Sequence, residues 1–105
     1  MGATGELVRV GGETQPMGVA RHLAEELGAG AAAVVLQGVG QASVHRMVKA
    51  VALAESEMGT GELWMRASFE VVAMDRGDER TAIRLEVRRG GGGLFIDYAQ
   101  KGRLV

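Results

Sequence analysis

Three basic or titratable side chains follow a short glycine-containing turn near the middle of the chain. The turn is Gly38-Val39-Gly40, and His45, Arg46 and Lys49 come after it at spacings that occupy adjacent turns of a helix. The first amides of a helix lack partners within the helix, and its dipole favours an anion at that end. This combination suits contact with phosphate. A solvated polar face is the alternative interpretation of the same side chains.

The glycine turn by itself does not define a nucleotide site. A dinucleotide fingerprint requires a further glycine where this chain has Ser43, and no Lys-Ser/Thr pair completes a P-loop. Two interpretations therefore stay open. The turn is a plain tight connection, or the amides near Gly40 and Gln41 contact phosphate without the full fingerprint.

A second group of cations lies in the last third of the chain. Arg76 lies within a turn-forming Asp-Arg-Gly-Asp segment and Arg80 follows it closely, so both lie near the tip, from which they could enter a groove of a nucleic acid. Several acids share this stretch, so much of its charge is compensated. For Arg84 and Arg88, further along, we expect ion pairs across neighbouring strands.

Catalysis and metal binding find little support in the sequence. Ser43 and Ser68 lack a His-Asp set that the sequence reveals, and Glu55 and Glu57 fall on opposite sides of a predicted helix. There is no cysteine, which excludes thiolate ligands and a cysteine nucleophile. The two histidines belong to separate predicted helices without an obvious carboxylate partner at ligand spacing, and His22 is expected on the surface. We predict a non-enzyme with no metal and no cofactor.

Size and charge limit the classes of partner. The chain has 105 residues, enough for one domain, and a dimer partner would improve its ratio of buried to exposed surface. Its formal charge of −1 excludes coating of nucleic acid by charge alone, so binding must rest on a local patch and be weak and salt-sensitive. The sequence shows no secretory leader and no apolar run near the roughly 20 residues of a membrane span. We expect a cytoplasmic location and no membrane partner.

Periodicity predicts the elements that position these side chains. The expected elements are a strand at Glu6 to Val10, a helix from Pro16 to Leu27, a strand at Ala32 to Leu36, a long helix ending near Met58, and a hairpin of strands at 62–74 and Thr81 to Arg88. An apolar stripe on the long helix is expected at Val44, Met47, Val48, Val51 and Met58. The order is β-α-β-α-β-β. It predicts an α/β two-layer fold with two helices on one face of a four-stranded mixed sheet.

The chain divides into residues 1–89, the predicted domain, and a tail of residues 90–105. Four glycines at 90–93 form a linker. The apolar segment from Leu94 to Tyr98 is either an extra short strand on a sheet edge or part of a disordered end.

Two segments carry a family resemblance: VHRMVKAVALAE, from Val44 to Glu55, and GDERTAIRLEV, from Gly77 to Val87. Together with Pro16 before the first helix, they resemble the stage V sporulation protein S (SpoVS) family over about Glu6 to Arg89. The resemblance implies an Alba-like fold and a link to late spore development, including coat assembly. Alba proteins are small dimers that bind nucleic acid through the start of the second helix and the hairpin.

The resemblance assigns two sets of contact residues. The central surface would hold Gly40, Gln41, His45, Arg46 and Lys49, and the hairpin arm would hold Arg76 and Arg80. Two functions remain open: a dimeric nucleic-acid-binding regulatory protein, for DNA or RNA, or a protein-interaction scaffold of the same shape without that role. The near-neutral charge, the acid-rich hairpin tip and the apolar tail favour the second, and the basic helix start favours the first.

Overall fold

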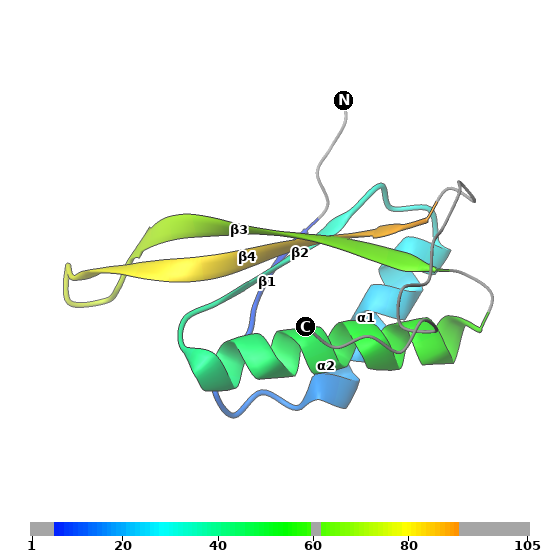
Figure 1. Ribbon diagram of the computed structural model, residues 1–105, viewed down its shortest axis with the longest axis horizontal. Coiled ribbons are helices and arrows are strands. Elements are labelled where there is room, and N and C mark those ends of the chain that lie inside the picture. Colours follow the sequence, from blue (N-terminus) through cyan, green and yellow to red (C-terminus); the bar gives the residue numbers. More distant parts are fainter. Residues whose placement is uncertain (1–5, 60–61, 91–105) are drawn as a thin grey trace, which may run out of the picture.

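Six elements follow one another in the computed structural model, which describes residues 6–59 and 62–90 (Figure 1). They are β1 (Leu7–Arg9), α1 (Pro16–Gly28), β2 (Val34–Gly38), α2 (Gln41–Met58), β3 (Leu63–Ala73) and β4 (Glu79–Arg89). The predicted β-α-β-α-β-β order is confirmed. The expected tail strand from Leu94 to Tyr98 lies outside the described residues.

A proline begins α1 and a glycine caps the end of α2, as the backbone preferences of these residues require. Pro16 opens α1, where its missing N–H has no partner to lose. Gly59 caps α2 with a φ of 74°, in the left-handed region that favours glycine, and its N–H donates to the Glu55 carbonyl. The sequence therefore located these ends through local chemistry.

The strands form a four-stranded mixed sheet in the order β1-β2-β4-β3. β1 runs parallel to β2, whereas β4 is antiparallel to both β2 and β3. Both helices lie on one side of the sheet (Figure 1). The predicted fold class, including the placement of the helices on one face, is confirmed.

The core lies between the two helices and the central strands. Its largest fully buried side chains are Leu23, Leu27, Val34, Leu36, Met47 and Val87. The expected stripe on α2 is wrong at Val48, which is 42% exposed, while Ala50 and Ala54 are fully buried. Alanines allow α2 to approach its neighbours closely. Hydrophobicity alone favours the larger side chain of Val48 for burial.

The bounds of β2 differ from those predicted for this strand. β2 covers Val34–Gly38 instead of Ala32 to Leu36, because Gln37 and Gly38 pair with Arg84 and Ile83 of β4. A polar residue and a glycine ended the apolar run in the sequence. The strand nevertheless includes both residues, because their backbones pair with β4.

The hairpin of β3 and β4 extends beyond the rest of the sheet. These strands pair over eleven residues each, from Leu63 with Arg89 to Ala73 with Glu79, whereas β2 reaches only Ile83. Gly77, with a φ of 85°, permits the tight turn. The part of the hairpin nearest the turn thus projects past the strands that the helices cover (Figure 1).

Candidate functional site

The start of α2 is a helix terminus without a side-chain cap. Its N-cap is Gly40, whose φ of 91° favours glycine, and no side chain of the described residues accepts a hydrogen bond from the first amides there. The first turn contains no acidic residue. The positive end of this 18-residue helix is therefore not neutralised by the helix itself.

A polar row runs along the exposed side of α2 from this start. Gln41, His45 and Lys49 are all exposed and are spaced four residues apart, so their side chains lie one above another on the helix surface. In the described part of the chain, Lys49 forms no ion pair. Its charge is available to a ligand.

Arg46 points away from this row. It is half-buried, and its Nη1 donates a hydrogen bond to the Thr14 carbonyl oxygen at 3.0 Å. This bond fastens the connection between β1 and α1 to the side of α2. The sequence grouped Arg46 with His45 and Lys49, but the structure gives it a contact within the protein as well as a charge.

Arg76 and Arg80 are exposed at the hairpin, Arg76 in the turn and Arg80 on β4. Figure 1 shows the hairpin turn and the start of α2 at the same end of the molecule. The acids Asp75 and Asp78 share the turn region, yet neither arginine forms an ion pair with a described residue. The two predicted groups of cations thus flank one end of the fold.

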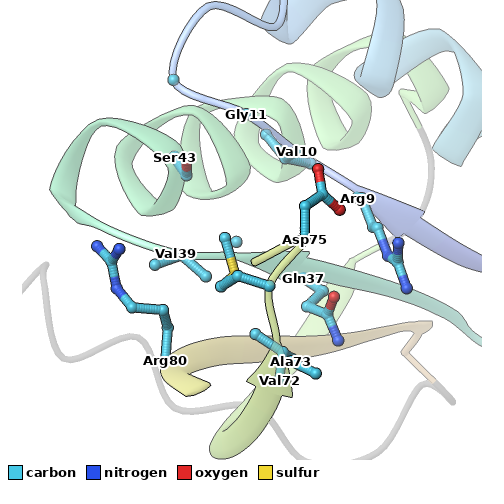
Figure 2. Close-up of a pocket in the computed structure, with 13 residues that line it drawn as sticks. Arg9, Val10, Gly11, Gln37, Val39, Ser43, Val72, Ala73, Asp75 and Arg80 are labelled. Atoms are coloured by element: carbon cyan, nitrogen blue, oxygen red, sulfur yellow. The ribbon is translucent and has the colours of Figure 1, made fainter. Parts of the chain in front are cut away.

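A cavity of about 430 Å³ lies between these two groups (Figure 2). Its walls come from the ends of β1 and β2, the beginning of α2, and the hairpin, and they include Arg9, Gln37, Ser43, Asp75 and Arg80. Sequence reasoning missed Arg9 and Gln37 as site residues. No local motif could have indicated them, because the cavity is assembled from four separate segments.

Arg88 pairs within its own strand instead of across the sheet. Its Nε donates to Glu86 Oε2 at 2.7 Å, and its Nη2 lies 2.5 Å from the same oxygen. The expected cross-strand pair is therefore wrong for Arg88, because residues two apart on a strand share one face. This hydrogen bond is the main reason that the pKa of Glu86 is lowered, with Arg88, Arg84 and Arg66 adding favourable charge and burial opposing the shift.

His22 has the carboxylate neighbours that the sequence did not reveal. Its Nε2 lies 2.7 Å from Glu6 Oε1, and ligand atoms of Glu6, His22 and Glu26 lie within 4.8 Å of one another. Glu26 follows His22 by four residues on α1, and Glu6 precedes β1. One imidazole and two carboxylates could hold a divalent cation, while the bond between His22 and Glu6 accounts for their approach without one.

Among the described residues, neither helix has the length and apolarity needed to cross a membrane.

Comparisons with known proteins agree with this fold. The sequence model of the family described as stage V sporulation protein S (SpoVS) matches residues 6–90. The solved structure of Alba from Thermoplasma volcanium is similar, with a TM-score of 0.58 and 14% sequence identity, over 79% of this chain and 99% of that chain. At this identity the similarity shows the fold alone. A search of curated proteins finds no match.

Proposed function

The chain belongs to the stage V sporulation protein S family and has an Alba-like fold, and from this premise we propose that it is a small dimeric protein that binds nucleic acid in the cytoplasm. The proposed contacts are with phosphates, through the start of α2 and the hairpin of β3 and β4. By resemblance to the family, the role is regulatory and linked to sporulation. The proposal assigns the chain a binding role and no catalytic step.

The observation that carries the proposal is the exposed row on α2. Gln41, His45 and Lys49 extend from a helix start without a side-chain cap. Arg76, which has no ion pair with a described residue, belongs to the hairpin turn at the same end of the molecule. Phosphates of a nucleic acid are repeated anions, so a row of donors and cations can contact several of them. The acids of α2, Glu55 and Glu57, lie at its other end and therefore do not neutralise this row.

The charges of α2 run against its own dipole. Glu55 and Glu57 lie in the last turn, where cations would be favoured, and the first turn has no acid. Such an arrangement lowers the stability of an isolated helix by a few tenths of a kcal/mol per charge. An anion bound at the start of α2 would supply the missing negative charge, which favours a polyanionic ligand.

Exposed apolar side chains support a dimer. Met65, Phe69 and Val71 are 46%, 79% and 64% exposed and alternate along β3, so they share one face of that strand. Monomeric proteins rarely expose several large apolar side chains together. A second copy of the chain would cover this face and would also bring two helix starts to one nucleic acid.

Binding measured at several salt concentrations tests the proposal. With a fluorescent DNA duplex and an RNA of the same sequence, Lys49→Ala and Arg76→Ala should each weaken binding. Each should also reduce the slope of log K against log salt by roughly 0.9 for duplex DNA. Arg21→Ala removes the same charge from the exposed surface of α1 and should leave the slope unchanged. Equal slopes for all four proteins would contradict the proposed surface.

The same apolar face favours one alternative function, a protein-interaction scaffold without significant nucleic-acid binding. Deleting residues 90–105 separates the two proposals. For a scaffold, the deletion should change the molar mass in light scattering or abolish partner capture. For the nucleic-acid-binding protein, affinity for DNA or RNA should survive the deletion.

A further inference from the structure

The cavity between the start of α2 and the hairpin has the size and position of a small-molecule site. Its volume of about 430 Å³ lies within the range of ligand pockets, roughly 300 to 1,000 Å³. It opens where the parallel strands β1 and β2 end, beside Val10, Gly11 and Gly38. Crevices outside the carboxyl ends of parallel strands are common ligand sites in α/β folds.

Two buried polar side chains in its walls have hydrogen-bonding capacity to spare. Ser43 is only 4% exposed, and its hydroxyl has no partner within residues 6–59 and 62–90. Gln37 is 8% exposed and donates from Nε2 to Glu70 Oε1 at 3.0 Å, which leaves its carbonyl oxygen free to accept. Among the described residues no side-chain nitrogen or oxygen atom is both buried and unpaired, so these two oxygen atoms are accessible from the open space of the cavity. They are therefore available to a polar ligand there.

Two arginine side chains on opposite sides of the cavity supply positive charge. Figure 2 shows Arg80 of β4 extending toward the start of α2, with Arg9 of β1 at the opposite side and Asp75 between them. Neither arginine forms an ion pair in the described part of the chain. Around Ser43, the positive end of α2 adds to the charge of Arg80. This end of the cavity suits a phosphate group.

The remaining wall suits an organic group attached to that phosphate. Val39, Val72, Ala73 and Met74 provide apolar surface in the lining of the cavity. Asp75 and the free carbonyl oxygen of Gln37 can accept hydrogen bonds from ribose hydroxyls or base amino groups. An inorganic anion would leave both the apolar wall and these acceptors unused.

We propose that this cavity binds a nucleoside phosphate, one nucleotide in size, with the phosphate at Arg80 and Ser43. The occupant is a free nucleotide or the terminal nucleotide of a single strand, which share this chemistry. A further consequence rests on the proposed function. Because Arg80 also belongs to the proposed nucleic-acid surface, a free nucleotide in the cavity would compete with nucleic acid at the hairpin.

Calorimetric titration of the full chain with adenosine 5′-monophosphate, adenosine and inorganic phosphate tests the binding. The monophosphate should bind roughly tenfold more tightly than either part alone, because only it uses both ends of the cavity. Arg80→Gln and Ser43→Ala should each weaken it several-fold. Arg76→Gln, which removes an equal charge outside the cavity, should leave the affinity unchanged. Circular dichroism checks that each variant is folded.

Two results would overturn the inference. The first is that millimolar monophosphate produces neither binding heat nor amide chemical-shift changes. The second is that Arg76→Gln and Arg80→Gln weaken monophosphate binding equally, because this would mean that the monophosphate is attracted by charge alone. A 5′-phosphorylated dinucleotide separates the two sources. Competition with the monophosphate supports the cavity as a strand-end site, whereas binding without competition places the strand elsewhere.

Arg9→Gln keeps this test distinct from that of the proposed function. Arg9 lines the cavity and lies outside the proposed nucleic-acid surface. Its replacement should weaken the monophosphate and leave the salt slope for duplex DNA unchanged. Suppose that Lys49→Ala leaves duplex binding unchanged while Arg9→Gln weakens binding of the monophosphate. This result would contradict the proposed nucleic-acid surface and support the cavity site.

Discussion

Two strands of the same sheet, β2 and β3, have opposite environments. All five residues of β2 are buried, because it lies between β1 and β4 and beneath the helices. None of the eleven residues of β3 is fully buried, because it is the edge strand of a hairpin that projects past the helices. Both strands are rich in apolar residues. Their difference therefore arises from position in the sheet and from helix coverage.

This contrast indicates a division of roles within the chain. The β1-α1-β2-α2 part supplies most of the buried core residues. The hairpin contributes β4 to that core and presents β3 outward, with a free edge of the kind that proteins normally protect. An apolar face retained on an exposed strand favours recognition as its purpose.

The largest expected effect on stability comes from shortening a side chain of the buried strand β2. Leu36→Ala should lower the free energy of unfolding by about 2–5 kcal/mol, because Leu36 is fully buried in the core. Phe69→Ala, at a concentration where the chain is monomeric, should change it by less than about 1 kcal/mol, because Phe69 already contacts water. Urea denaturation measures both. Similar losses would remove the distinction between the strands.

A charge on the exposed strand should act on assembly instead of on folding. Phe69→Asp places a carboxylate in the proposed dimer face, where its desolvation opposes association. We expect light scattering to give the dimer mass for the wild type and the monomer mass for the variant. Glu70→Asp, on the other face of the strand, should remain dimeric. A dimer of Phe69→Asp would locate the interface elsewhere.

A smaller effect is expected where β2 meets α2. A Cβ on Gly38 would lie 2.6 Å from Met47 Sδ and 2.9 Å from Ser43 Cβ, so Gly38→Ala should destabilise the fold by about 1–3 kcal/mol. A Cβ on Gly18, in α1, would have no neighbour within 4 Å among the described residues, so Gly18→Ala should instead stabilise the fold by about 1 kcal/mol. Thermal denaturation compares the two. A neutral Gly38→Ala would mean that Met47 and Ser43 can move away.

The smallest effect concerns the charges on the hairpin. The hydrogen bond from Arg88 lowers the pKa of Glu86 below its ordinary value of 4.5. A lowered folded-state pKa stabilises the protein above the unfolded-state value, and the gain is lost as the pH falls through the folded-state value. Glu86→Gln should therefore lower the Tm slightly at neutral pH, with the difference vanishing in acid. A difference that persists at low pH would contradict the ionic contribution.

The candidate site was partly predictable. The glycine turn and the side chains of Gln41, His45 and Lys49 follow from local spacing, since a helix places residues four apart on one side. The inward contact of Arg46 with Thr14 depends on how the connection before α1 crosses α2, which no local pattern encodes. The pairing of His22 with Glu6 likewise depends on the docking of α1 beside the start of β1.

The sequence by itself determined the order of the elements, the helix ends at Pro16 and Gly59, and the turn at Gly77, because these depend on backbone preferences and periodicity within a few residues. Tertiary structure alone decided the strand order β1-β2-β4-β3, the exposure of Val48 and Phe69, and the cavity beside Ser43. Periodicity shows which side chains share a face. Only the packing of distant segments determines whether that face meets the core, a partner or water.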